Sequence, residues 1–201
     1  MLSLPEELII LISTFLNNKE KIVLTSLTKS FNMFQKKFIY RDSIEASEIM
    51  NVPYNNNFTY VEYTHSSNEK PIPSFVTHLY TNDFFNEPLY ELPKSLKFIC
   101  IKMWFGDKIN TSASITHILF DKWSSWYEYG DIPYNVTHVM MEGTIVCIKK
   151  KIPDTVKYLF VGETNKTTLN LENVSSLTKI IYFDNNNCKI IVDFIDSASQ
   201  L

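Results

Sequence analysis

The 201-residue chain has only four glycines, three cysteines and a single arginine. Its glycines form neither a glycine-rich phosphate loop nor a G-x-S-x-G nucleophile motif. Cys100, Cys147 and Cys188 are far apart and include no C-x-x-C pair, a usage typical of reduced thiols and not of a disulfide framework or a zinc site. These absences predict that the chain is not an enzyme and that it uses no metal or cofactor.

Charge and hydropathy argue against two further kinds of partner. The net charge is −3, and eighteen lysines accompany the lone Arg41, whereas bidentate recognition of bases and phosphates favours arginine. No stretch reaches the roughly 18 apolar residues of a membrane-spanning helix, and the N-terminus carries Glu6 and Glu7 in place of the basic region of a signal peptide. We therefore expect a protein of the cytoplasm (the host cytoplasm if the gene is viral), not secreted, with no nucleic-acid or membrane partner.

Residues 4 to 40 have the apolar spacing of short amphipathic helices. The first run is Leu4, Leu8, Leu11, Ile12, Phe15 and Leu16, and the second is Ile22, Leu24, Leu27, Phe31, Phe34 and Phe38. Spacings of three and four residues place such side chains on one helical face. Two or three short helices with this many apolar positions either cap the domain that follows or dock on a partner.

The order of these residues resembles an F-box, the helical motif that binds the Skp adaptor of Skp–cullin–F-box ubiquitin ligases. The resemblance covers residues 1–45 and rests on the order L-P-x-E-L followed by apolar residues at regular spacing. Two positions depart from the pattern, because Asn18 replaces a usual proline and Lys21 replaces a commonly apolar residue. The resemblance implies an adaptor-binding set made of Leu4, Pro5, Leu8, Ile12, Phe15, Leu16, Ile22, Leu24 and Leu27.

The remainder of the chain repeats every 20 residues or so. Prolines fall at positions 53, 73, 93, 133 and 153, and an apolar pattern of the form L-x-x-L-x-L follows at regular spacing. One earlier degenerate copy begins at Phe58, and the first positions of the six good copies are Val76, Leu96, Ile115, Val136, Val156 and Leu177. Periods of this length are typical of solenoid proteins.

Twenty residues hold one short strand and a loop return but no full crossover helix. A single unit cannot bury its apolar face, so neighbouring units must stack to form a continuous core. The sequence therefore predicts an α+β protein, in which a helical F-box-like segment (1–45) precedes a leucine-rich-repeat-like solenoid of about seven 20-residue repeats (46–201). Prolines are expected just before each strand, where a missing N–H does least harm.

One copy, residues 72–96, resembles the FNIP repeat of amoebal and giant-virus proteins. The resemblance rests on Phe85-Asn86-Glu87-Pro88-Leu89, and it extends over residues 72–183 in rhythm. FNIP repeats often follow an F-box, and the pairing implies a substrate receptor: the F-box would bind the Skp adaptor, and the repeats would bind an unknown target protein.

Alternation along the predicted strands selects the residues of the outward face. One column of this face holds three histidines, and a second holds no charge from residue 80 onward. An apolar and aromatic stripe beside imidazoles is typical of a protein-binding surface, which predicts target binding by His78, Tyr80, Phe98, His117, Leu119, His138, Met140, Tyr158, Phe160 and Ile181. Two alternatives are that the C-terminal segment 188–201 folds over this face, or that two chains pair there.

The histidines do not have the spacing of a metal site. His117 and His138 would be ladder neighbours about 5 Å apart, with no carboxylate or cysteine placed to complete a tetrahedral site. We expect them to be polar, pH-responsive contacts, while His65 falls in a polar loop. The alternative function is a non-catalytic structural or interaction solenoid. In it the N-terminal helices only cap the repeats, and the repeat face pairs with itself (self-association) or with a partner outside the ubiquitin system.

Overall fold

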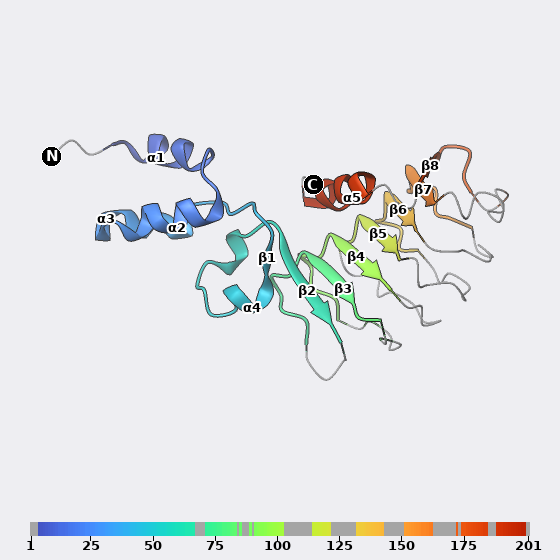
Figure 1. The fold of residues 1–201 in the computed structure, drawn as a ribbon, viewed down its shortest axis with the longest axis horizontal. Helices are drawn as coiled ribbons and strands as arrows, with labels where there is room; N and C mark the ends of the chain where they lie inside the picture. The colour runs from blue at the N-terminus through green and yellow to red at the C-terminus, as the bar shows by residue number, and fades with distance from the viewer. Residues whose placement is uncertain are drawn as a thin grey trace. The chain divides into compact units, whose positions relative to one another are not determined.

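The computed structural model describes residues 4–66, 71–83, 85, 89, 91–102, 114–121, 132–142, 151–162, 172, 174–184 and 188–199. The chain forms two compact units, Met1–Glu62 and Tyr63–Leu201, and Figure 1 shows the elements of each. The predicted boundary at residue 45 lies earlier than this division, because the first strand-and-loop coil packs with the helices.

Short helices build the start of the first unit. Helix α1 (Glu6–Ser13) begins after Pro5, and its first turn carries two glutamates, which the helix dipole favours. Helix α2 (Asn18–Ser26) has a full capping box, in which the Asn17 side chain accepts from the Glu20 N–H and the Glu20 carboxylate accepts from the Asn17 N–H. Helix α3 (Lys29–Asn32) is capped by Thr28 and continues into the 3-10 turn η1 (Met33–Lys36).

The rest of the first unit is one coil closed by aromatic stacking. It consists of β1 (Ile44–Glu45), α4 (Ala46–Ile49), η2 (Asn55–Asn57) and the start of β2 (Val61–His65), which pairs in parallel with β1. The rings of Tyr40 and Phe58 stack with centroids 4.4 Å apart, and the Tyr54 ring lies 5.4 Å from that of Tyr40. Because Tyr40 and Phe38 are fully buried, this stack joins the helices to the first coil.

The second unit is a parallel ladder, as the repeat predicts. Its strands are β3 (His78–Thr81), β4 (Phe98–Ile101), β5 (His117–Phe120), β6 (His138–Met141), β7 (Tyr158–Gly162) and β8 (Lys179–Phe183), paired in sequence order. The register aligns equivalent repeat positions, so that Phe98 pairs with His117 and His117 with His138. Five strand-to-strand steps separate β3 from β8. The solenoid of about five turns is therefore confirmed, with slightly fewer turns than the repeat count predicted.

A tight turn that begins at a proline precedes β3, β4, β6 and β7. The carbonyl oxygens of Pro73, Pro93, Pro133 and Pro153 accept from the N–H three residues later, at 3.0 to 3.1 Å. That N–H belongs to the first apolar residue of each repeat, such as Val136 or Val156. Proline therefore supplies its carbonyl and a fixed φ, and the missing N–H costs nothing there. The prediction that the prolines lie just before the strands is confirmed.

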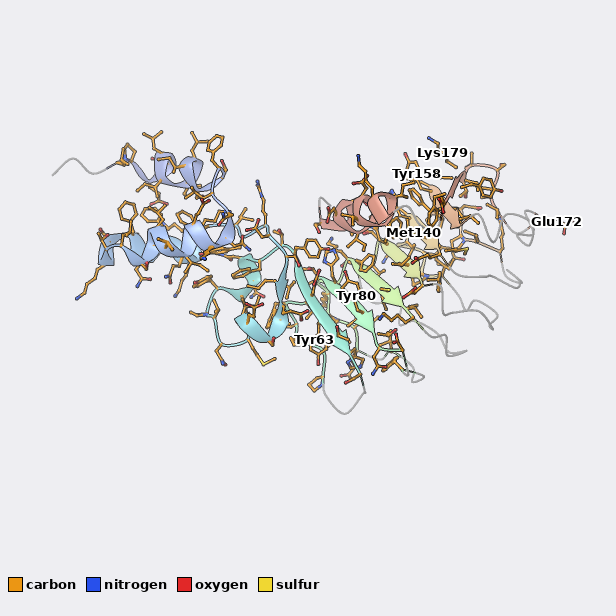
Figure 2. All side chains as sticks on the ribbon, viewed as in Figure 1. Tyr63, Tyr80, Met140, Tyr158, Glu172 and Lys179 are labelled. Atoms are coloured by element: carbon orange, nitrogen blue, oxygen red, sulfur yellow. The ribbon has the colours of Figure 1, made fainter. Side chains whose placement is uncertain are left out.

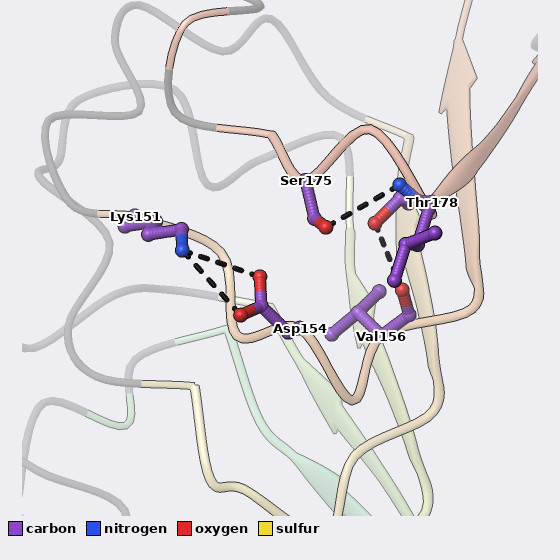
Figure 3. Close-up of polar contacts among 6 residues, drawn as sticks. Lys151, Asp154, Val156, Ser175 and Thr178 are labelled. Carbon is purple, nitrogen blue, oxygen red and sulfur yellow. Dashed lines mark hydrogen bonds and ion pairs between the residues drawn. The ribbon is translucent and has the colours of Figure 1, made fainter.

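Hydroxyl groups link successive turns to one another. Figure 3 shows the last such link, in which Thr178 Oγ1 donates to the Val156 carbonyl oxygen at 2.8 Å. Within the last turn, Ser175 Oγ accepts from the Leu177 N–H at 3.3 Å. In the turn before it, Lys151 forms an exposed ion pair with Asp154 at 3.2 Å. Ser95 and Ser114 make equivalent bonds to carbonyl oxygens one turn earlier. These short side chains satisfy carbonyl groups at the point where the ladder begins.

The core of the second unit is a set of stacked apolar rows. The first apolar position of each repeat is buried at Val76, Leu96, Ile115, Val136 and Val156, and the inward strand positions are buried at Leu79, Ile99, Ile118, Val139 and Leu159. Phe85 and Leu89, the flanks of the FNIP-like core, are also buried, while the three residues between them lie outside the described residues. His65 lies at the end of β2 and is buried, with its ring centroid 5.1 Å from that of Phe85, so the expectation of a polar loop there is wrong.

Two leucines at the same repeat position test how much the stacking contributes. Leu96 is 0% exposed in the middle of the ladder, whereas Leu177 is 81% exposed in the last turn. We expect Leu96→Ala to lower the free energy of unfolding by about 2–5 kcal/mol and Leu177→Ala to change it by less than about 0.5 kcal/mol. Urea denaturation of both variants measures the difference, and equal losses would contradict the assignment of the core.

Candidate interaction surfaces

The helices of the first unit expose an unusual number of large apolar side chains. Only Ile9 and Ser13 of α1 are buried, and these two positions, four residues apart, face the unit. Leu8 and Ile12 are each 44% exposed, and Phe15 just after the helix is 82% exposed. A surface of this kind marks an interaction site in most soluble proteins. Other large apolar residues that are exposed on α1, α2 and their flanks are Leu4, Leu11, Ile22, Val23 and Leu27.

Helix α2 turns its polar side inward. Its buried residues are Asn18, Lys21 and Thr25, spaced as one helical face, whereas Ile22 and Val23 are exposed. This is the reverse of the pattern expected for a helix that packs on a core with its apolar face. The apolar residues Ile22 and Val23 of α2 therefore lie on the surface of the unit.

Specific hydrogen bonds hold this inverted helix. The Asn18 N–H donates to Asp42 Oδ2 at 2.6 Å, and the Asn18 side-chain amide donates to the Asp42 carbonyl oxygen at 3.0 Å. Lys21 Nζ donates to the Ile39 carbonyl oxygen at 2.7 Å. The two departures from the F-box pattern are thus the residues that anchor α2 from within the unit.

The structure leaves every residue of the predicted adaptor-binding set accessible in some degree. Leu16 and Leu24 are half-buried, and all the others are exposed: Leu4, Pro5, Leu8, Ile12, Phe15, Ile22 and Leu27. Leu11, Val23 and Met33 are further exposed apolar residues that the resemblance did not include. Their signal in the sequence was weak, because a single helix pattern cannot tell an inward from an outward face.

A different arrangement is found on the outward face of the ladder. Helix α5 (Cys188–Ser199) lies along this face (Figure 1), and its Phe194 and Ala198 are buried in a cluster with Phe98, Leu119 and Met140. Tyr80 and Phe160 pack against the same cluster, and Figure 2 labels Tyr80 and Met140 on the strands beneath the helix. The C-terminal segment thus covers the face, which is one of the alternatives that the sequence left open.

The prediction that this face is open to solvent is therefore wrong. Its residues are correctly assigned to one face, since the register aligns them in two columns, but half of the ten are buried, and several of these lie in the cluster that α5 covers. Tyr158 is exposed, and His138, Tyr80, Phe160 and Ile181 are half-buried. The residues that are buried are His78, Phe98, His117, Leu119 and Met140.

Helix α5 is the main element that the sequence reasoning missed. Ile190, Ile191, Phe194, Ile195 and Ala198 are spaced at one, three, one and three residues, which is the apolar stripe of a helix. These are the side chains that pack on the strands. The apolar spacing is visible in the sequence, but spacing within one segment does not show where a helix packs.

The three histidines of the face belong to one column, in which Phe98 separates His78 from His117. The rings of His117 and His138 stack with centroids 4.3 Å apart and an interplanar angle of 7°, which confirms the predicted neighbours. Each histidine shares a hydrogen bond at Nδ1 with the hydroxyl of the threonine before it, at 2.9 Å for His78, 2.9 Å for His117 and 2.8 Å for His138. The repeated Thr-His pair therefore fixes the ring orientation in each turn.

The other ring nitrogen of two histidines points at α5. His117 Nε2 lies 3.0 Å from Ser197 Oγ, and His78 Nε2 lies 3.3 Å from Ser199 Oγ. The Phe194 ring meets that of His117 edge-on at 5.3 Å. These contacts give the otherwise apolar interface two polar anchors and a defined register for the helix.

Burial keeps these histidines neutral. It lowers the pKa of His78 to about 4, and burial, together with the neighbouring His138 and His78, lowers the pKa of His117 to about 3. Burial and then the charge of Lys157 lower the pKa of His138 as well. The charged residues of α5, Lys189, Asp193 and Asp196, are exposed, and none of them is among the groups that shift the pKa of His78 or His117.

Within the described ranges, no three histidine, cysteine, aspartate or glutamate side chains gather as a metal site would require. No helix in the described part of the chain is long and apolar enough to cross a membrane. Cys100 is a buried thiol beneath α5, and burial raises its pKa, which makes it a weak nucleophile.

These features define a repeat protein of the protein-interaction class: a parallel solenoid with about five turns, preceded by a helical unit with exposed apolar residues. The chain is similar to an FNIP repeat-containing protein of Acanthamoeba polyphaga mimivirus, with 28% identity over 137 residues that cover 60% of this chain and 35% of the relative. The chain thus spans about a third of the length of that curated relative. The match confirms the predicted resemblance to FNIP repeat proteins and does not bear on the F-box. No family model matches the sequence.

The buried histidines make the docking of α5 sensitive to pH. Because the pKa values of His78 and His117 fall below their ordinary value of 6.5, the unfolded chain binds more protons between pH 6.5 and 3. Stability is therefore fully present above pH 6.5 and falls as the pH decreases through that window, by on the order of 3 kcal/mol per histidine at its lower end. Urea unfolding at a series of pH values measures this loss.

The control is the double variant His78→Gln and His117→Gln, compared with the wild type at each pH. Subtracting the two curves removes the titration of carboxylates, which both proteins share. We expect the difference in unfolding free energy to shrink as the pH falls below 6.5. Parallel curves would show that neither histidine is held neutral at the interface.

Proposed function

We propose that this chain is a substrate-receptor subunit of a Skp–cullin–F-box type ubiquitin ligase. In this role the first unit binds the Skp adaptor and the repeats hold a target protein. Catalysis belongs to the other subunits of the ligase, and the complex acts in the cytoplasm. The observation that supports the proposal most directly is the inverted helix α2, whose apolar Ile22 and Val23 face outward while polar Asn18 and Lys21 are buried.

A capping role for the helices fits the exposed surfaces less well. A cap buries its apolar side chains and presents a polar face to solvent. Here Leu8, Ile12 and Phe15 keep 44%, 44% and 82% of their surface exposed. Fully burying an exposed side chain of this size contributes about 1.5–3 kcal/mol, of which Phe15 would gain most and Leu8 and Ile12 about half. Such residues can serve as the apolar anchors of an adaptor interface.

Target binding by the repeats must take helix α5 into account. We place the target on the strand face, where Tyr80, Leu119, Met140 and Phe160 form an apolar surface. Since α5 occupies this surface, a target competes with the chain's own helix, and its net affinity is reduced by the free energy of displacing α5. The exposed edge at Tyr158 gives the target a first contact while α5 is still docked.

The adaptor interaction is tested by Leu8→Asp together with Ile12→Asp. Burying two carboxylates in place of two apolar anchors should reduce recovery of the Skp adaptor in a pull-down by at least about a hundredfold. The tagged full chain is used as bait, and circular dichroism checks that both proteins are folded.

Leu177→Asp is the matched control, because Leu177 is an exposed leucine in the second unit. It should recover the adaptor as well as the wild type does. The F-box assignment fails if the wild type recovers no adaptor, or if the double variant recovers as much as the control.

Displacement of α5 is tested by Phe194→Asp, with Val192→Asp as its control. Phe194 is buried against the strands, whereas Val192 on the same helix is 51% exposed. The buried carboxylate should undock α5, raise the binding of a fluorescent apolar dye several-fold and increase the recovery of target proteins in quantitative affinity purification. Val192→Asp should change neither.

Adding Tyr80→Glu and Phe160→Glu to the Phe194→Asp variant places the charges on the face itself. Target recovery should then be lost while adaptor recovery is kept. If the triple variant recovers as much target as Phe194→Asp alone, the target does not bind the strand face. If Phe194→Asp alone recovers no more target than the wild type, α5 does not compete with the target.

A further inference from the structure

Lys21 is a buried cation in the first unit. Its side chain is only 3% exposed, and its position is one where the F-box pattern commonly has an apolar residue. Nζ donates to the Ile39 carbonyl oxygen at 2.7 Å and lies 5.9 Å from the centroid of the Tyr40 ring. An ammonium group has three N–H donors, so one backbone carbonyl does not satisfy it.

No carboxylate of the described residues forms an ion pair with Lys21. Asp42 is the nearest source of negative charge, but its carboxylate accepts from the Asn18 N–H at 2.6 Å at the start of α2. Burial lowers the pKa of Lys21; Asp42 opposes this effect and Arg41 adds to it. Buried charges in proteins are usually paired, and this one has no direct counter-ion.

Lys21 is one of the residues that line a small cavity. Its volume is about 60 Å³, and it is lined by Lys21, Lys37 and Arg41 together with Ser13 and Thr14. The side chains of Ile10 and Ile39 complete the walls. The cavity has room for a few water molecules, which is also the size of a single phosphate group.

The charges around the cavity are mainly positive. Arg41 is the only arginine of the chain, and it forms no ion pair within the part of the chain that the structure describes. Lys37 is already paired with Glu6 at 2.6 Å. The hydroxyls of Ser13 and Thr14 donate to carbonyl oxygens of α1. Recognition of an anion would therefore depend on Lys21 and Arg41.

We infer that the cavity formed by Lys21, Arg41 and Lys37 is a binding site for a single phosphate group. The anion supplies the counter-charge that Lys21 lacks, and the planar guanidinium of Arg41 offers the paired N–H groups that suit phosphate oxygens. The proposal goes beyond the proposed function and does not rest on it, since all these residues belong to the first unit and no adaptor or target is involved.

Inorganic phosphate is the probe for this site. Calorimetric titration of the full chain, with chloride adjusted to keep the ionic strength constant, should show saturable binding at one site. Lys21→Met keeps the length and the apolar stem of the side chain and should weaken phosphate binding at least tenfold. Arg41→Gln, on an exposed side chain, should weaken it about fivefold without disturbing the fold.

Lys36→Met is the matched control, because Lys36 is an exposed lysine nearby in sequence that does not line the cavity. Its affinity for phosphate should stay within twofold of the wild type. The proposal is overturned if the wild type shows no saturable binding, or if Lys21→Met and Lys36→Met bind phosphate equally while both are folded.

Methyl phosphate distinguishes two sources of the anion. Binding as tight as that of inorganic phosphate indicates that the site takes a phosphate group carried on a larger molecule. Binding of inorganic phosphate alone indicates a free ion. Both results support the site, and neither depends on adaptor recovery, so a failure of the phosphate proposal is distinct from a failure of the proposed function.

Discussion

The structure depends on the in-register parallel pairing of successive turns. Every turn places the same repeat position opposite its equivalent in the next strand, so side chains of one kind form continuous columns. The inward columns become a core that no single turn could make. The outward columns become an apolar and imidazole-bearing face that is too large to leave in water. Helix α5 covers this outward face and shields it from water.

The interface between α5 and the strands combines apolar burial with polar anchors. Phe194 and Ala198 provide the burial, while Ser197 and Ser199 meet ring nitrogens of His117 and His78. The threonines on the other side of the rings orient them. This arrangement suits neutral imidazoles, because burial disfavours the charged form of His78 and His117. Helix α5 therefore covers the strand face, and we expect its docking to depend on pH.

In the first unit, helix α2 packs with its polar side and leaves apolar residues exposed. Its core is small, built on the stack of Tyr40, Tyr54 and Phe58, and it is joined to α2 by polar contacts of Asn18 and Lys21. Because polar residues hold α2 from within, its apolar residues are free to face outward. An exposed apolar surface and a buried cation are thus two results of one inverted helix.

The sequence alone determined the repeat, the strand positions and their register. Proline spacing and the L-x-x-L-x-L pattern were sufficient, because each strand pairs with its neighbour in sequence and the side-chain period of two leaves one choice of face. The helical nature of residues 4 to 40 followed in the same way from local spacing.

Only the tertiary structure decided which surfaces are open. The spacing of Ile22 and Val23 is the same for an inward and an outward face, and the tie between Asn18 and Asp42, 24 residues apart, settles it. The strand face at His117 and Met140 has the same apolar pattern whether a target or α5 covers it. The contact between His117 and Ser197, 80 residues apart in the sequence, shows that α5 covers it. Exposure depends on what packs from elsewhere in the chain, and periodicity within a segment carries no information about that.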